Sequence, residues 1–195
     1  MIVIIDNGHG VDTPGKCSPI WGDYTQLREY EFNRDVAQRI AYHCKMNGIP
    51  FQMLVPEAYD ISLDERVRRA NAIYRKDWHS FVVSVHANAG GGTGWEAWTS
   101  KGKTKSDTFA TIFYEEAERE FGKEWNIRKD ITDGDADKES QFYILKHTLC
   151  AAVLTENFFM DTERDCRFIM SDEGRERIAI MHFRAIKRIY DTYGK

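Results

Sequence analysis

The sequence is poor in cysteine and proline: its 195 residues contain four of each, and no two cysteines form a CxxC pair. A chain of this length buries about 70% of its unfolded surface, so it needs no disulfide framework to fold. Cys44 lies on a predicted helix face and Cys150 opens an apolar strand, which predicts buried, reduced thiols. Cys17 and Cys166 fall in predicted loops, and the sequence leaves their pairing open.

Long apolar runs and long basic runs are also missing. No stretch of about 18 apolar residues is present to cross a membrane, and no signal peptide precedes the first expected strand. A chain trimmed of its leader would look the same, so the route of export stays open. The net charge is −4 and includes no long basic run, which argues against nucleic acid as a partner.

What the sequence does contain is an alternation of short apolar strands and amphipathic helices, without internal repeats, low-complexity segments or linkers. This succession predicts a single α/β domain over residues 1–195, with three layers: a mainly parallel sheet with helices on both faces. Residues 95–99 could pair antiparallel, and residues 141–146 are expected to form a short strand or turn. The expected strands are 2–5, 51–55, 81–85, 95–99 and 151–155, and the expected helices are 29–47, 62 to about 74, 105–121 and 171–190.

Two histidines each follow one of these predicted strands. His9 lies in Asp-Asn-Gly-His-Gly after residues 2–5, and His86 lies in Ser-Val-His-Ala-Asn-Ala after residues 81–85. The carboxyl ends of parallel strands meet at one edge of a sheet, where ligands collect. Two imidazoles at this edge could hold a metal ion, although either one alone could be a hydrogen-bonded structural residue.

Two carboxylates are expected at the same edge. Glu29 begins the predicted helix 29–47, and Glu156 ends the predicted strand 151–155. Two histidines and one carboxylate form a common catalytic zinc set, which leaves a fourth position for water. A second carboxylate can then move the proton of that water, and an apolar pocket would raise its pKa. Residue types alone leave alternatives open. Glu31 could be the ligand in place of Glu29, and Glu29 could only stabilise the start of the helix through the helix dipole. Glu156 could pair with an arginine.

Five short motifs follow one another along residues 2–160. They are Asp6-Asn7-Gly8-His9-Gly10; Glu29 with Asn33 four residues on; Ser62-Leu63-Asp64-Glu65-Arg66-Val67-Arg68-Arg69-Ala70-Asn71; Ser84-Val85-His86-Ala87-Asn88-Ala89; and Val153-Leu154-Thr155-Glu156-Asn157-Phe158-Phe159. In this order they resemble the motifs of the zinc-dependent N-acetylmuramoyl-L-alanine amidases. That family has Pro in place of Asn7, and more often a small residue and Gly in place of Asn157 and Phe158.

The resemblance implies a site, a reaction and a place of action. His9, Glu29 and His86 would bind one Zn²⁺ per chain, with Glu29 selected over Glu31 by the register, and Glu156 would be the catalytic carboxylate. The reaction would be cleavage of the amide between the lactyl group of N-acetylmuramic acid and L-alanine. A monomer would bind peptidoglycan or a muropeptide at the cell wall. It would act outside the cell, in the periplasm or after release as a phage-type lysin.

Substrate contacts and rival functions complete these expectations. Trp21, Tyr24, Asn88 and Trp95 are candidate substrate-binding residues, because loops over this edge of the sheet reach substrate. Trp95 could equally belong to the core, since it lies on an expected strand. The acidic residues 133–137 lack the glycine and glutamate of a calcium loop, which predicts a solvated loop. The alternatives are a zinc peptidase or amidase on free muropeptides, and a non-catalytic wall-binding or regulatory domain with the same fold.

Overall fold

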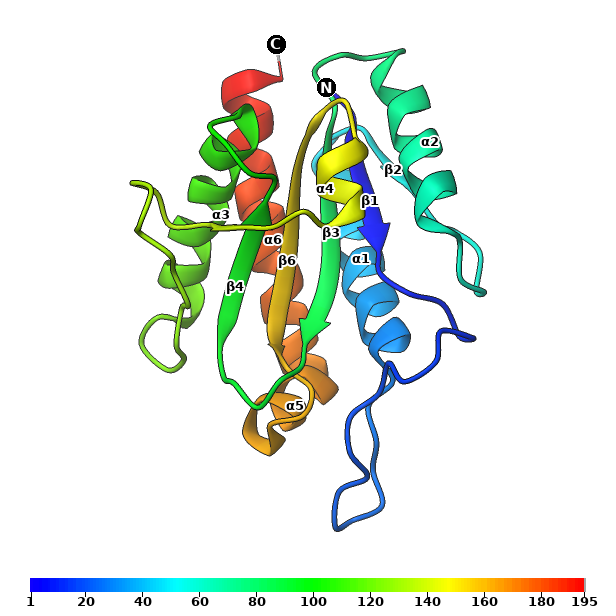
Figure 1. Cartoon of the computed structure of the whole chain (residues 1–195), viewed down its shortest axis with the longest axis vertical. Coiled ribbons are helices and arrows are strands. Elements are labelled where there is room, and N and C mark those ends of the chain that lie inside the picture. Colours follow the sequence, from blue (N-terminus) through cyan, green and yellow to red (C-terminus); the bar gives the residue numbers. More distant parts are fainter. Residues whose placement is uncertain (195) are drawn as a thin grey trace.

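Figure 1 shows a computed structural model of the chain, which describes residues 1–194. Six strands form one sheet in the order β2-β1-β3-β6-β4-β5. Every neighbouring pair is parallel except β4 with β6, so the predicted mainly parallel sheet is confirmed. The strands are β1 (Val3–Asn7), β2 (Phe51–Met53), β3 (Phe81–Asn88), β4 (Trp95–Thr99), β5 (Lys138–Glu139) and β6 (Ala151–Phe159).

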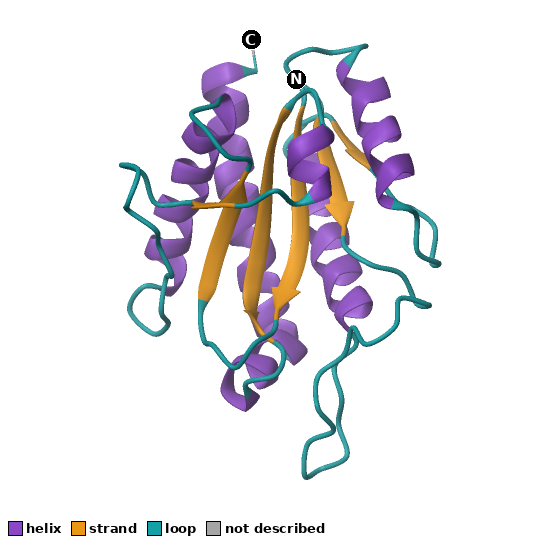
Figure 2. Cartoon of the chain, in the orientation of Figure 1, coloured by secondary structure: helices purple, strands orange, loops and turns teal. Residues whose placement is uncertain are grey.

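Helices cover both faces of the sheet, as expected (Figure 2). Each face has its own hydrophobic core. The larger core packs under α1 (Glu29–Met46), α3 (Lys105–Phe121), α5 (Glu163–Met170) and α6 (Asp172–Tyr193). The smaller core packs under α2 (Leu63–Tyr74) and α4 (Tyr143–His147). Successive strand residues point to opposite faces, so Val83 joins the larger core and Val82 the smaller.

The sequence also specifies where helices begin. The Ser62 hydroxyl accepts a hydrogen bond from the Glu65 N–H at the start of α2. Thr104 and Asp107 form a reciprocal capping box at the start of α3. Both arrangements satisfy backbone N–H groups that have no partner within the helix. The cap at Ser62 fixes the start of the helix that carries Arg66 toward the site.

Several local predictions need correction. Residues 141–146 were expected as a strand or turn, but α4 begins at Tyr143; its single turn is too short to show helical periodicity. Strands β3 and β6 run past the predicted ends, so His86 and Glu156 lie within strands. The short elements β5 and α5 were not predicted. Among residues 1–194 no helix combines the length and the apolar character needed to cross a membrane.

Candidate active site

His9 follows β1 on a turn that only a glycine allows. A Cβ atom on Gly8 would lie 2.1 Å from Cε1 of His86, so any side chain there would displace the imidazole. His9 itself has a φ of 64°, an uncommon left-handed conformation for a residue with a side chain. The two imidazole rings meet edge to face with their centroids 5.0 Å apart. The turn therefore brings two histidines together from positions far apart in the sequence.

Glu29 is the first residue of α1 and is buried between the two histidines. Its Oε1 lies 3.3 Å from Nε2 of His9 and 3.2 Å from Nδ1 of His86, and it accepts a hydrogen bond from the Ala87 N–H. Burial opposes ionisation of Glu29, but the hydrogen bonds from His86 and His9 outweigh it and hold its pKa well below the usual range. Glu29 is therefore a carboxylate at neutral pH.

One ligand atom from each of His9, Glu29 and His86 lies within 4.8 Å of the others. The Oε2 atom of Glu29 is buried and accepts no hydrogen bond. Glu31, the rival by residue type, is exposed and bonds to the neighbouring Tyr30 hydroxyl. The fold thus brings Glu29 to the histidines and leaves Glu31 in solvent.

Glu156 lies beside this cluster on β6. It is the register partner of His86 on β3 and of Glu96 on β4, so all three side chains share one face of the sheet. Burial raises the pKa of Glu156 to about 7, with the charges of Glu29 and Glu96 adding to the shift and His86 opposing it. Its Oε2 atom is also buried without a partner. Such a carboxyl can hold or release a proton near neutral pH.

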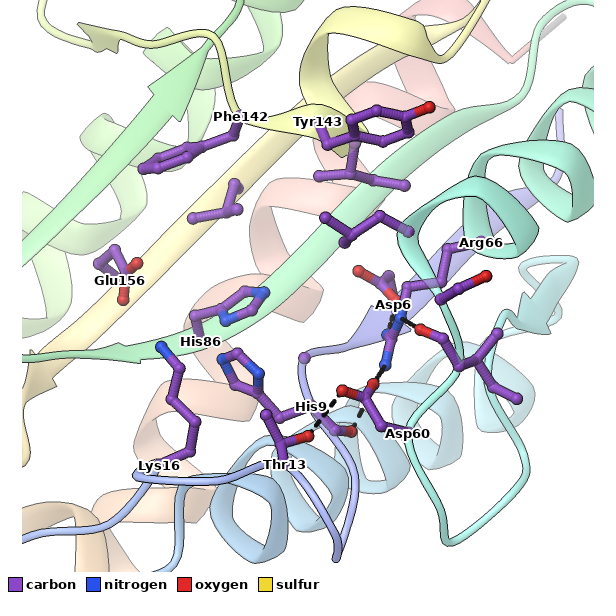
Figure 3. A pocket seen from close by; sticks show the side chains of 16 residues that line it. Asp6, His9, Thr13, Lys16, Asp60, Arg66, His86, Phe142, Tyr143 and Glu156 are labelled. Carbon is purple, nitrogen blue, oxygen red and sulfur yellow. Dashed lines mark hydrogen bonds and ion pairs between the residues drawn. The ribbon is translucent and has the colours of Figure 1, made fainter.

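A cavity of about 490 Å³ opens over these groups (Figure 3). His9, His86 and Glu156 lie at one end, Arg66 lies on the side of α2, and Phe142 and Tyr143 come from the start of α4. None of these last three residues was predicted as part of the site, because neither a buried cation nor an aromatic pair has a sequence signal of its own. Lys16 also lines the cavity, with Nζ 3.8 Å from Oε2 of Glu29.

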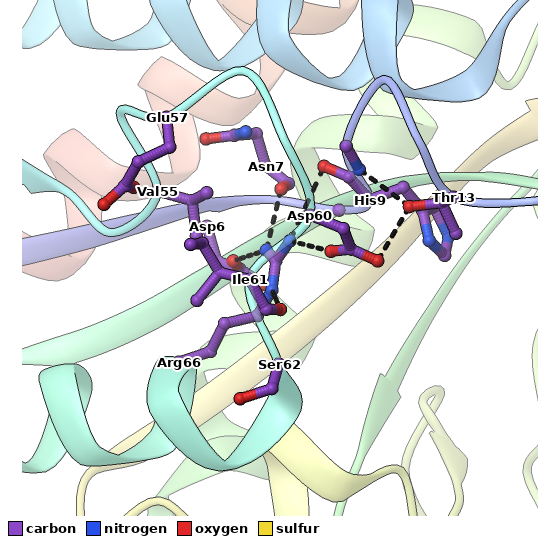
Figure 4. Close-up of polar contacts among 12 residues, drawn as sticks. Asp6, Asn7, His9, Thr13, Val55, Glu57, Asp60, Ile61, Ser62 and Arg66 are labelled. Carbon is purple, nitrogen blue, oxygen red and sulfur yellow. Dashed lines mark hydrogen bonds and ion pairs between the residues drawn. The ribbon is translucent and has the colours of Figure 1, made fainter.

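Arg66 holds the turn that carries His9 (Figure 4). Its guanidinium is 3% exposed, and Nη1 donates to the Asp6 carboxylate at 2.6 Å and to the Asn7 carbonyl at 2.9 Å. Nη2 donates to Asp60 at 2.9 Å and Nε donates to the carbonyl of Ile61. One buried cation thus ties β1, the His9 turn and the loop before α2 together.

The four predicted substrate residues lie outside the cavity lining. Trp95 is fully buried, and its indole N–H donates to the side chain of Asn157 at 2.9 Å; the expectation that it contacts substrate is wrong, because it has no accessible surface. Trp21 is half-buried and bonds to Cys166, whereas Tyr24 is 91% exposed. Asn88 donates to Glu96, so it reaches the site only through that carboxylate.

The cysteines are all reduced in residues 1–194. Cys44 and Cys150 are buried, as predicted. Burial raises the pKa of both thiols to about 12, which keeps them protonated. Cys17 is exposed and Cys166 is buried, and the structure forms no disulfide between them.

A mainly parallel α/β sheet with two histidines and two glutamates converging at one edge has the architecture of a hydrolase. Known proteins identify the family: the profile described as N-acetylmuramoyl-L-alanine amidase matches residues 3–188. The chain belongs to this family. The predicted activity, hydrolysis of the amide between the N-acetylmuramic acid lactyl group and L-alanine in peptidoglycan, is confirmed by this membership.

Individual relatives agree in sequence and in fold. The chain is 26% identical over 192 residues to the N-acetylmuramoyl-L-alanine amidase CwlM of Bacillus licheniformis, covering 97% of this chain and 68% of that protein. The crystal structure of an N-acetylmuramoyl-L-alanine amidase from Clostridium difficile is 21% identical, with a TM-score of 0.81 over 98% of this chain and 97% of that one. Amidase AmiC2 of Nostoc punctiforme is 20% identical, with a TM-score of 0.80 over the same shares of the two chains.

Proposed function

We propose that this amidase works with one Zn²⁺ held by His9, Glu29 and His86, with Glu156 as its catalytic carboxyl group. The observation that carries the proposal is the convergence of one ligand atom from each of the three residues within 4.8 Å, directly beside Glu156. Two imidazole nitrogens and one carboxylate oxygen form a donor set that Zn²⁺ uses in catalytic sites.

The unsatisfied atoms of the site support this assignment. A buried oxygen without a hydrogen bond is costly, and Glu29 keeps Oε2 in this condition while Oε1 faces both imidazoles. The lowered pKa of Glu29 keeps the group in the form that binds a cation. A cation at this point would compensate the buried negative charge, which Lys16 approaches only to 3.8 Å.

Zinc bound here would supply a Lewis acid for the substrate carbonyl and would lower the pKa of water at the site. Glu156 would take a proton from the attacking water and would give it to the departing nitrogen of L-alanine. A carboxyl group whose pKa lies near 7 is suited to both transfers at neutral pH. Phe142 and Tyr143 form an aromatic side of the cavity.

The substrate and the place of action follow from the family. Peptidoglycan or its muropeptides would be bound at the cell wall, and one chain supplies all four groups, which is consistent with a monomer. One relative, the CwlD amidase of Clostridioides difficile, was solved in complex with the GerS lipoprotein. The measured molar mass of the purified protein is expected to be that of a monomer.

The test combines metal analysis with product analysis. Purified wild type is expected to contain about one zinc per chain, and His86→Ala is expected to lose it. His79→Ala serves as the matched control, because His79 is exposed and lies outside the cavity. Glu156→Gln should keep its zinc but lower the release of L-alanine amino termini from sacculi at least 100-fold.

Two results would overturn the proposal. The metal assignment fails if His86→Ala retains zinc at the level of wild type. The role of Glu156 fails if Glu156→Gln, with zinc bound, hydrolyses sacculi at the wild-type rate. Mass spectrometry of the fragments also distinguishes an enzyme that hydrolyses intact sacculi from one that hydrolyses only free muropeptides. A non-catalytic domain would release no fragments from either substrate.

A further inference from the structure

A second charged cluster lies on the same face of the sheet, one strand beyond Glu156. Its centre is Glu96 on β4, the register partner of Glu156, and Glu96 is buried. Its Oε2 atom accepts hydrogen bonds from Nε of Arg128 at 2.6 Å and from Nζ of Lys138 at 2.7 Å. Two cations around one carboxylate leave the cluster with one positive charge in excess.

Arg128 is held rigidly in this cluster. Its backbone N–H donates to the Trp95 carbonyl at 2.8 Å, and its carbonyl accepts from the Tyr114 hydroxyl at 2.9 Å. Its guanidinium lies 5.1 Å from the centroid of the Phe159 ring. Only Nε is used for Glu96, and Nη1 and Nη2 have no acceptor within residues 1–194. The side chain is 34% exposed, so these two nitrogens are presented to solvent in a fixed position.

The cluster adjoins the catalytic cavity through the ring of Trp98. Lys138 lies 5.2 Å from the centroid of the Trp98 ring, and the Trp98 indole donates to Oε1 of Glu96. The Trp98 ring in turn meets the ring of Phe142, which lines the cavity, at 5.4 Å. Trp98 therefore joins the cluster around Glu96 to the wall of the cavity.

The distances fit a peptide. Neighbouring strands lie about 4.8 Å apart, and an extended peptide advances about 3.3–3.6 Å per residue. One or two residues beyond the scissile amide therefore span the step from Glu156 on β6 to the cations around Glu96 on β4. The peptide stem of peptidoglycan carries carboxylates in this part, and a guanidinium fork is the protein group best shaped to bind one.

We propose that Arg128, with Lys138 beside it, forms a subsite for a carboxylate of the peptide stem beyond L-alanine. The inference rests on the proposed function, since it places the scissile amide at Glu156. Glu96 orients the two cations, and the free edge of the Arg128 guanidinium binds the substrate. The enzyme would thus select stems with free carboxylates over stems in which these groups are carboxamides.

The test compares two soluble substrates that differ only in this charge: a muramoyl tripeptide with free stem carboxylates, and the same compound with them amidated. Wild type is expected to show a KM about tenfold lower for the carboxylate form, with similar kcat, because a hydrogen bond to a charged group is lost on amidation. Arg128→Gln is expected to raise KM about tenfold for the carboxylate form only. Arg164→Gln is the matched control, because Arg164 also stacks on an aromatic ring, Trp125, yet lies outside the cavity lining and the Glu96 cluster.

The outcomes separate the two proposals. Equal KM values for both substrates with wild type would overturn the subsite, and this comparison does not depend on any variant folding. An Arg128→Gln protein that keeps the wild-type preference would overturn the role of Arg128. If wild type hydrolyses neither substrate, the proposed function fails and the subsite fails with it. Zinc content and melting temperature of each variant show whether a loss reflects binding or folding.

Discussion

Replacing Arg66 with methionine is expected to destabilise the whole fold and to disorder the metal-binding end of the cavity. Methionine keeps most of the length and apolar volume of the side chain but removes every donor. The carboxylate of Asp6 would remain buried with only the Ser84 hydroxyl at 2.6 Å as a partner. The carbonyls of Asn7 and Ile61 would lose the hydrogen bonds that the guanidinium now donates.

The magnitude follows from the burial of the pair. Arg66 and Asp6 each have side chains 3% exposed, so the loss of one partner leaves an uncompensated charge in the interior. Breaking a buried pair in this way costs about 3–5 kcal/mol in the free energy of unfolding. For a chain of about 200 residues, each kcal/mol lowers the melting temperature by about 2–4 °C. The expected decrease is therefore roughly 6–20 °C.

Urea unfolding followed by circular dichroism measures this change directly. The matched control is Arg68→Met on the same helix, because Arg68 is 69% exposed and its side chain bonds only to Glu65, so its loss should cost less than about 1 kcal/mol. Adding Asp6→Asn to Arg66→Met should recover part of the loss by removing the buried charge. A cost below 1 kcal/mol for Arg66→Met would refute the reasoning.

Two further predictions concern the glycine turn and a buried histidine. Gly8→Ala should weaken zinc binding at least tenfold while the circular dichroism spectrum stays native, because its Cβ would lie 2.1 Å from the His86 ring. The control is Gly22→Ala, whose Cβ would meet no atom within 4 Å. Equal zinc titrations of the two variants would contradict the steric argument. Burial lowers the pKa of His182 to about 4, so the unfolded chain takes up this proton below about pH 6.5 and the folded chain only below about pH 4. The free energy of unfolding should therefore fall with decreasing pH across this window. Between pH 7 and 5, urea unfolding should show that wild type loses about 2 kcal/mol more of this free energy than His182→Gln. Parallel pH profiles of the two proteins would show that the buried imidazole is not the cause.

The layout of the site could be predicted because parallel strands place distant residues at one edge. His9 follows β1, and His86 lies near the end of the neighbouring strand β3. Glu156 lies on β6, the next strand along the sheet. Apolar runs of four or five residues are enough to reveal such strands in a sequence. The ends of the strands were less accurate, because polar residues such as His86 and Glu156 remain paired within the sheet.

The residues around the site were not predictable in the same way. Arg66 was visible only as one letter of a motif, since the carboxylate and carbonyls that it binds come from separate segments. Arg128 lies in a polar segment without periodicity, and its partners Trp95, Tyr114 and Glu96 come from other parts of the chain. Trp95 was misassigned because a strand at residues 95–99 does not say whether it lies at the edge or inside the sheet. Side chains alternate along β4, so Trp95 packs into the larger core while Glu96 points to the other face of the sheet.

The burial of Trp95 explains a departure from the family pattern. An indole N–H in the core requires an acceptor, and the side-chain oxygen of Asn157 supplies it at 2.9 Å. The amide nitrogen of Asn157 donates to the backbone carbonyl of His86, also at 2.9 Å. A smaller residue at position 157 would leave both groups without this partner. Asn157 thus connects the core to the strand that carries His86, and it acts on the position of the histidine through the backbone.

Phe158 shows how the second departure is accommodated. It adopts a φ of 66°, a conformation that favours glycine, which the family more often has at this position. The ring of Phe158 is fully buried and lies 4.9–5.2 Å from the ring centroids of Phe121, Trp125 and Phe168. Burying a phenylalanine contributes roughly 1.5–3 kcal/mol, which is comparable to the roughly 1–3 kcal/mol cost of the left-handed backbone. The aromatic cluster therefore stabilises the irregular stretch of β6 after Glu156, where the register with β3 shifts and Asn88 pairs with Phe159.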